Sequence, residues 1–280
     1  MTWTFTHDLA AYRAAAGPAV AADPVSNTLL LTMEGALVRR GPHAYSDHDP
    51  VFGWWTGADG AVAGALVCTP PFPLVLGRVP DEAVAALGEA LHREPLLGGI
   101  GGFNARRADG ERLAQAWGRP VGDPEVLRLY RLGELVAPHP APAGRARTAG
   151  EADLPLVREW FTAFAVELDD RVPGDAVVRD RVAQRGVVLW EDGGGRPVAV
   201  ASFSAEVGGA SRIGPVYTPP AERRRGYAAG VTHAAVGAAR LAGAAEVLLF
   251  ADTANPTSTG VYLRLGFRPV EDRAVVVPAA

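Results

Sequence analysis

The chain contains no lysine, so all 27 of its basic residues are arginine, and they face 31 aspartates and glutamates. The resulting formal net charge of −4 argues against a general nucleic-acid-binding surface. Cysteine is almost as scarce. With Cys68 as the single cysteine, the chain has neither an internal disulfide nor a cysteine-based metal site.

Long hydrophobic runs are also missing. No apolar stretch reaches the roughly 18–20 residues that cross a bilayer. The first residues lack the basic region and hydrophobic segment of a secretion signal. We therefore expect a cytoplasmic protein with no membrane partner and no nucleic-acid partner.

The six histidines lack metal-ligand spacing. The segment His43 to Asp49 places two histidines and two aspartates close together in the sequence. It is read either as a polar loop, which we favour, or as a metal site. We expect no metal.

The length of 280 residues suits two domains of about 135–140 residues each. Residues 137–146 are rich in proline, alanine and glycine, and predict a semi-stiff linker. We therefore expect one domain over residues 1–140 and a second over residues 141–280. Alternating strand and helix patterns in both parts predict the α/β class, with mixed sheets flanked by helices.

The two halves follow the same order of patterns, which predicts an internal duplication. In the C-terminal half, strands are expected over 145–148, 187–191, 197–206, 212–217, 246–252 and 268–277, and helices over 151–168 and 175–185, in the alanine-rich stretch opened by 223–228, and from 255. In the N-terminal half, strands are expected over 51–57, 61–68, 73–79, 99–104 and 125–135, and helices within 8–38 and over 81–92 and 111–117.

A phosphate-binding pattern lies between one of these strands and the helix after it. Arg223 to Ala228 reads R-x-x-G-x-A and leads into an alanine-rich helix. A loop of small residues at a helix N-terminus directs several backbone N–H groups, and the positive end of the helix dipole, towards one point. Gly226 and Ala228 leave room for a pyrophosphate to approach the backbone.

A second pattern follows about thirty residues later. After a buried strand, the chain reads Asn255-Pro256-x-Ser258, with Tyr262 one turn on and Gly266-Phe267 at the end of the helix. Together, the two patterns resemble the core motifs of the GNAT superfamily of acyl-CoA-dependent N-acyltransferases. The resemblance covers about 60 residues strongly. It implies a mostly antiparallel central sheet flanked by helices.

The N-terminal half resembles a degenerate copy of the same domain. Between Leu74 and Asp81 there is no R-x-x-G-x-A. The helix that follows begins with Asp81 and Glu82, whose charges repel a pyrophosphate. The resemblance thus implies a tandem arrangement in which only the C-terminal half binds the cofactor.

By this resemblance, the protein uses acetyl-CoA as co-substrate and transfers an acetyl group to the amine of a small molecule or peptide. The pantetheine arm would lie along the strand around Val216, with a nearby backbone N–H on the thioester oxygen. The implied cofactor-binding residues are Val216, Tyr217, Thr218, Arg223, Arg224, Arg225, Gly226, Tyr227, Ala228, Ala229, Asn255 and Ser258.

Tyr262 is the candidate general acid, since a phenol matches the departing thiolate better than a carboxylic acid does. It could instead be a core tyrosine. Glu206 is the candidate base, acting through water, or else an exposed turn residue. Glu167 and Asp169, with Asp170, either line the acceptor site or form a solvated acidic turn. Asn255 could simply cap its helix.

Two other functions stay open. The C-terminal half could bind acyl-CoA without turnover, as a sensing module, or the protein could acetylate protein lysines or N-termini. The sequence does not identify the acceptor, and it allows a monomer or a homodimer.

Overall fold

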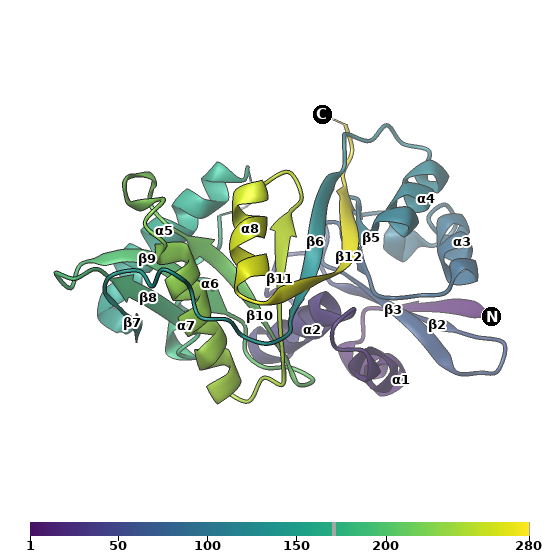
Figure 1. The fold of residues 1–280 in the computed structure, drawn as a ribbon. Helices are drawn as coiled ribbons and strands as arrows, with labels where there is room; N and C mark the ends of the chain where they lie inside the picture. Colours follow the sequence, from purple (N-terminus) through teal and green to yellow (C-terminus); the bar gives the residue numbers. More distant parts are fainter. Residues whose placement is uncertain (170–171, 280) are drawn as a thin grey trace. The chain divides into compact units, whose positions relative to one another are not determined.

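The computed structural model describes residues 1–169 and 172–279. The chain divides into two compact units (Figure 1). Unit 1 consists of Met1–Leu129, Asp252–Ala254 and Glu271–Ala280, and unit 2 of Tyr130–Ala251 and Asn255–Val270. Both combine a mixed sheet with helices, as the composition and periodicity predict.

The two halves of the sequence have the same order of elements, β-α-α-β-β-β-α-β-α-β. The first repeat comprises β1 (Thr2–Thr6), α1 (Leu9–Ala22), α2 (Thr28–Arg40), β2 (Val51–Thr56), β3 (Val62–Cys68), β4 (Leu74–Leu76), α3 (Asp81–Ala90), β5 (Phe103–Arg106), α4 (Arg107–Trp117) and β6 (Glu125–Leu132). The second comprises β7 (Arg145–Thr148), α5 (Leu154–Glu167), α6 (Asp175–Ala183), β8 (Val187–Glu191), β9 (Pro197–Phe203), β10 (Ala210–Tyr217), α7 (Tyr227–Leu241), β11 (Glu246–Asp252), α8 (Pro256–Arg264) and β12 (Phe267–Val276). Short 3-10 turns occur at Pro95–Leu97, Glu151–Asp153 and Pro220–Glu222.

The strands of the two repeats also have equivalent orders. In the first, β1, β2, β3, β4 and β5 are successive neighbours, and in the second β7, β8, β9, β10 and β11 are. The fourth and fifth strands pair in parallel in both repeats, β4 with β5 and β10 with β11. The other neighbouring pairs are antiparallel. They are β1 with β2, β2 with β3 and β3 with β4 in the first repeat, and β7 with β8, β8 with β9 and β9 with β10 in the second. This repetition agrees with the predicted internal duplication.

The sheet of unit 2 is covered on both faces, because side chains of successive strand residues point to opposite faces. On β8, Val187 and Leu189 pack in a cluster with α5 and α6, whereas Val188 between them packs in a cluster with α7. Helix α7 lies across β8, β9 and β10 (Figure 1). Small residues such as Ala235 and Ala239 let this helix approach the sheet closely.

The last strand of each repeat lies partly in the compact unit formed by the other repeat. The end of β12 pairs with β5 of unit 1, with Ala274 opposite Ala105 and Val276 opposite Phe103. Residues 130–132 of β6 belong to unit 2, and β6 is next to β11 in the strand order. The compact units therefore differ from the expected domains 1–140 and 141–280, because each repeat gives part of its last strand to the other unit.

Some elements differ from the sequence predictions. Strand β1 was not predicted, although Thr2–Thr6 alternates threonine with aromatic residues. Strand β5 begins at Phe103 instead of 99, after a glycine-rich stretch. Strand β9 ends at Phe203 instead of 206. The expected linker is packed at its end, where the indole N–H of Trp190 donates to the carbonyl of Ala143 at 2.9 Å.

Candidate functional site

Strands β10 and β11 of unit 2 diverge halfway along their length. Their parallel pairing runs from Ala210 opposite Glu246 to Ile213 opposite Leu249. Beyond Ile213, a β-bulge shifts the register with β9, and Val216 then lies opposite Ala201. Beyond Ile213, Val216 and Tyr217 therefore pair with β9 and not with β11, which leaves the other edge of this part of β10 available to an extended ligand.

The connection from β10 to α7 ends in a loop suited to anions. Arg224 has φ +63° and Gly226 has φ +81°, and Gly226 is the residue before the first turn of α7. Alternation of left-handed and ordinary backbone turns consecutive N–H groups to one side. No side chain within the described residues caps this helix start. Its first N–H groups, which have no acceptor inside the helix, can bind a phosphate.

The three arginines of the loop have different partners. Arg223 binds both carboxylate oxygens of Glu167 at 2.7 Å, and the hydroxyl of Tyr217 donates to the same carboxylate at 3.3 Å. Arg225 donates to the buried Glu222 at 2.9 Å. Arg224 is exposed. Two of the three guanidinium groups therefore brace the loop through carboxylates, and the backbone of the loop is the principal anion ligand.

Helix α7 is approached closely by the segment before β7. A Cβ atom at Gly230 would lie 2.7 Å from Cγ of Pro142 and 2.9 Å from the Trp190 ring. Glycine is therefore required at 230 for this contact. Pro142 also lies 3.5 Å from the Cβ position of Gly226, so the expected linker supports the start of the helix.

Tyr262 lies on α8, where its ring packs edge-on against Phe267 at 6.1 Å between centroids. The side chain is half-buried and contacts the same core as α7. Burial raises the pKa of the Tyr262 hydroxyl to about 12. Within the described residues this hydroxyl forms no hydrogen bond, so it remains available to a ligand.

The side chain of Asn255 caps α8 by accepting a hydrogen bond from the N–H of Ser258 at 3.1 Å. Asn255 thus has the helix-capping role that was its alternative, and Ser258 supplies the capped N–H. Because the cap uses the side-chain oxygen of Asn255, its amide N–H groups stay free to donate.

The predicted acidic residues have different surroundings. Glu206 lies in the turn between β9 and β10 and accepts the N–H of Gly209 at 2.5 Å, so it precedes the paired part of β10. Glu167 is bound by Arg223 and Tyr217. Asp169 has φ +51° just after α5. Asp170 lies outside the described residues.

Two residues near the bulge have no signal in the sequence. The hydroxyl of Ser202 on β9 donates to the carbonyl of Gly214 at 2.7 Å, and Nη1 of Arg181 on α6 donates to the same oxygen at 3.3 Å. They are far from Gly214 in the sequence, and neither is part of a recognisable motif.

The equivalent place in unit 1 is filled by an arginine. Strands β4 and β5 pair at Leu74 opposite Phe103 and at Val75 opposite Asn104. Just beyond, Nη2 of Arg273 donates to the carbonyls of Leu76 and Asn104 at 2.7 and 2.8 Å, and Nε donates to the side chain of Asn104 at 2.9 Å. Arg273 is only 2% exposed. Its guanidinium therefore bridges the ends of β4 and β5.

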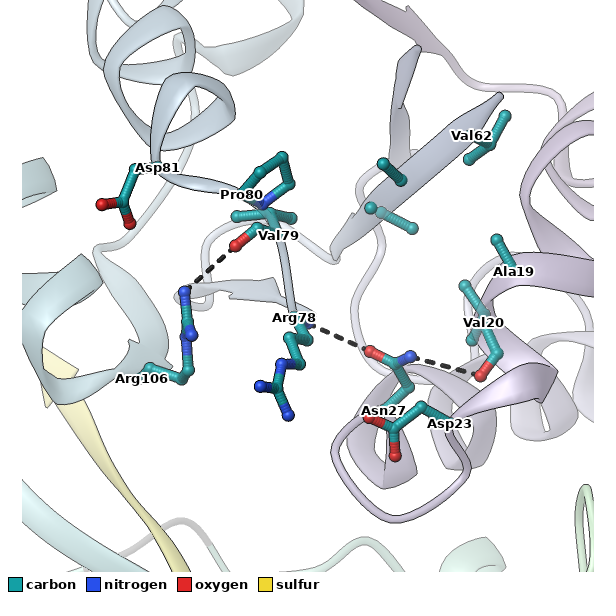
Figure 2. A pocket seen from close by; sticks show the side chains of 13 residues that line it. Ala19, Val20, Asp23, Asn27, Val62, Arg78, Val79, Pro80, Asp81 and Arg106 are labelled. Atoms are coloured by element: carbon teal, nitrogen blue, oxygen red, sulfur yellow. Dashed lines mark hydrogen bonds between the residues drawn. The ribbon is translucent and has the colours of Figure 1, made fainter. Parts of the chain in front are cut away.

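Unit 1 also lacks the anion loop. Residues 77–80 alone connect β4 to α3, whereas residues 218–226 connect β10 to α7. Beside this short connection lies a cavity of about 530 Å³, and Arg78 is one of the residues that line it (Figure 2). The N–H of Arg78 is held by Asn27 at 3.1 Å, and Arg106 donates to the carbonyl of Val79 at 3.0 Å. Asp81 and Glu82 occupy the first turn of α3, as the sequence indicates.

Within residues 1–169 and 172–279, no group of histidine, cysteine and acidic side chains could hold a metal ion. In the same residues, no helix is both long enough and apolar enough to cross a membrane. Cys68 is completely buried in the core of unit 1, and burial raises the pKa of its thiol to about 12. A thiol that stays protonated at neutral pH is a core residue and not a nucleophile.

One known protein family matches the part of the chain that forms this site. Residues 154–267, which include the divergent strands, the anion loop and Tyr262, match the model of the acetyltransferase (GNAT) family. No curated protein sequence matches the chain.

Solved structures match over the whole length. A Drosophila protein has a TM-score of 0.69 at 13% identity and covers 99% of this chain and 98% of its own. A GNAT-family acetyltransferase from Colwellia psychrerythraea has a TM-score of 0.61 at 11% identity, with 100% of both chains covered. A tandem GNAT protein from the clavulanic acid biosynthesis pathway has a TM-score of 0.56 at 16% identity, covering 99% and 98%. The predicted fold, two GNAT-like domains in tandem, is confirmed.

Proposed function

We propose that unit 2, whose residues 154–267 match the model of the acetyltransferase (GNAT) family, is an acetyl-CoA-dependent N-acetyltransferase. Its acceptor is the amine of a small molecule or a peptide. The observation that carries the proposal is the combination, in one unit, of an unpaired edge on β10 with an uncapped helix start at Gly226.

The residues of unit 2 fit acetyl-CoA. Backbone N–H groups from Arg224 to Ala229 would hold the pyrophosphate, and the unpaired edge around Val216 and Thr218 would hold the pantetheine arm. Asn255 and Ser258 would contact the arm from α8. Acetyl-CoA supplies an acyl thioester, and the protein supplies orientation, a backbone donor and a proton.

Tyr262 donates that proton. As the acceptor nitrogen bonds to the acyl carbon, the carbon–sulfur bond breaks and the thiolate takes the phenolic proton of Tyr262. Its pKa, raised by burial to about 12, keeps the hydroxyl protonated at neutral pH. A backbone N–H near Val216 stabilises negative charge on the acyl oxygen.

The acceptor amine must lose a proton as well. Glu206, the predicted base, precedes the paired part of β10 and so lies at the opposite end of this strand from Val216. We propose that the acidic end of α5, with Glu167 and Asp169, favours a cationic acceptor. In the free protein Glu167 is paired with Arg223. A cationic acceptor would therefore compete with Arg223 for this carboxylate.

A screen of amines, with release of free thiol from acetyl-CoA as readout, tests the proposal. An acceptor-dependent release that disappears in Tyr262→Phe is the expected result. Tight acetyl-CoA binding without thiol release for any small amine, peptide or protein substrate would instead identify a non-catalytic acyl-CoA-binding module. Failure to bind acetyl-CoA at all would overturn the proposal.

A further inference from the structure

The carbonyl of Gly214, at the bulge of β10, is fixed by a small network of side chains. Ser202 donates to it at 2.7 Å and Arg181 at 3.3 Å, and Arg181 also donates to the Ser202 hydroxyl at 3.3 Å. Ser202 is fully buried. Both donors come from elements other than β11, namely β9 and α6. The carbonyl is therefore held towards β9 and α6.

The carbonyl of Gly214 lies where the pairing of β10 with β11 ends. Gly214 is the first residue after the last pair between β10 and β11, and its φ of +144° is a backbone conformation that favours glycine. The next residue, Pro215, has no N–H. The peptide between them offers an acceptor and no donor. If its oxygen faced β11, it would repel an acyl oxygen on the unpaired edge.

We propose that Arg181 and Ser202 are positioning residues for the acyl group. By holding the Gly214 carbonyl towards β9, they remove an acceptor from the unpaired edge of β10, and leave the backbone donor at Val216 as the nearest partner of the acyl oxygen. This inference rests on the proposed function, because it concerns the thioester of acetyl-CoA. In it, the two side chains act through the Gly214 carbonyl.

The experiment uses the full chain and acetyl-CoA labelled with ¹³C at the thioester carbonyl. Infrared spectra report how strongly that carbonyl is hydrogen-bonded when bound. In parallel, dissociation constants are measured for acetyl-CoA and for S-ethyl-CoA, which lacks the carbonyl. The variants are Ser202→Ala and Arg181→Met. The conservative variant is Ser202→Thr, and the control is Arg179→Met, an exposed arginine on the same helix that pairs with Asp175.

In the wild type, the carbonyl band should move to lower frequency on binding. Ser202→Ala and Arg181→Met should lose most of that shift, and their preference for acetyl-CoA over S-ethyl-CoA should fall about three- to tenfold, the effect of one hydrogen bond. Their affinity for S-ethyl-CoA should stay within about twofold. Ser202→Thr and Arg179→Met should behave like the wild type.

The outcomes separate this inference from the function on which it rests. If the wild type binds acetyl-CoA with a shifted carbonyl, and Ser202→Ala and Arg181→Met keep the same shift and preference, the positioning role is overturned while the proposed function stands. If the wild type does not bind acetyl-CoA, both are overturned. Equal losses of affinity for both ligands would indicate general damage to the sheet and would also contradict the positioning role.

Discussion

At the scale of single residues, the hydroxyl of Tyr262 is the group whose removal is most informative. Tyr262→Phe keeps the ring and its edge-on contact with Phe267. Turnover should fall by about 10²-fold, the scale of general acid catalysis, with acetyl-CoA affinity unchanged. Steady-state kinetics and calorimetry check this. The matched control is Tyr130→Phe, another tyrosine of the same unit. Wild-type turnover in Tyr262→Phe would make Tyr262 a core residue only.

The same residue sets an expectation for pH. Because burial raises the pKa of Tyr262 to about 12, its acidic form persists through neutral and moderately alkaline pH. Turnover should therefore show no alkaline decline from this group until the pH approaches that value.

Gly226 meets two requirements, a left-handed backbone and space next to the proposed pyrophosphate site, and two variants can separate their effects. Its φ of +81° favours glycine, and it is the last residue of the loop before α7, where the pyrophosphate is proposed to bind. Gly226→Asp should abolish acetyl-CoA binding, since it adds bulk and negative charge next to the pyrophosphate. Gly209→Asp is the control, because Gly209 has a φ of +83° and open space around its Cβ position. It should carry similar backbone strain but bind acetyl-CoA normally in calorimetry. Equal binding by both variants would refute the role of Gly226.

Residue-level prediction from the sequence succeeds where a motif is local. Arg223 to Ala228 and Asn255 to Tyr262 are short segments, and the chain places them at a helix start and on a helix, as expected. Arg181 and Ser202 could not be found in this way, because they meet Gly214 only through the packing of three elements. The pairing of Glu167 with Arg223 was likewise invisible, since 56 residues separate them.

At the scale of elements, Arg147 ties β7 to the rest of unit 2. It donates to Asp153 at 2.6 Å and to Glu191 at 2.5 Å. These hydrogen bonds hold the pKa of Asp153 and the pKa of Glu191 below their ordinary values. A lowered carboxyl pKa stabilises the fold fully above the unfolded-state value, about 4, and this contribution is lost as the pH falls from that value through the lower folded-state pKa.

Arg147→Gln should therefore be less stable than the wild type at pH 7, and its stability should decline less between pH 6 and pH 3. Urea unfolding across this range measures both effects. Arg145→Gln is the control, because Arg145 is 80% exposed and its contact with Glu191, at 3.3 Å, is longer than that of Arg147. An unchanged pH dependence in Arg147→Gln would show that the two carboxylates are not stabilised by this arginine.

The buried arginine on β12 is a second element-scale feature. Arg273 joins the ends of β4 and β5 and forms an ion pair with Glu271 at 3.3 Å. Burial lowers the pKa of its guanidinium, and Glu271 opposes this. Arg273→Met leaves two backbone carbonyls, the side-chain oxygen of Asn104 and one carboxylate without this donor. The change should destabilise unit 1 by about 3–5 kcal/mol.

Urea unfolding measures this loss, with Arg268→Met, an exposed arginine on the same strand, as the control. The affinity of the full chain for acetyl-CoA should not change, because the proposed site lies in unit 2. A stable Arg273→Met variant that binds a second acetyl-CoA would instead mean that the arginine blocks a site that is otherwise intact.

At the scale of the whole molecule, local patterns predicted the repeat but not the exchange of its last strands. Hydrophobic alternation identifies β6 and β12 as strands, yet alternation does not specify the neighbour with which a strand pairs. The proline-rich stretch before Arg145 therefore indicated a boundary at 140, although residues 130–132 lie in unit 2 and 271–279 in unit 1. A domain boundary predicted from composition differs from the boundary of the packed unit whenever a terminal strand packs in the other unit.

This exchange predicts what happens when the chain is cut. A fragment of residues 141–280 lacks β6 and retains a β12 whose partner β5 is absent. A fragment of residues 1–140 lacks the end of β12, including Arg273. Each exposes an unpaired strand edge, which promotes association with other chains. Expressed alone, each fragment should therefore be insoluble or self-associated.

Expressed together, the two fragments should form a 1:1 complex that binds one acetyl-CoA. Light scattering gives the assembly state, and calorimetry gives the stoichiometry. The full chain is the control and should also bind one acetyl-CoA, because Arg273 fills the equivalent place in unit 1 and residues 77–80 are too short to form the loop. A monomeric fragment 141–280 with full acetyl-CoA affinity would show that the exchanged strands are dispensable, and a stoichiometry of two would show that unit 1 retains a cofactor site.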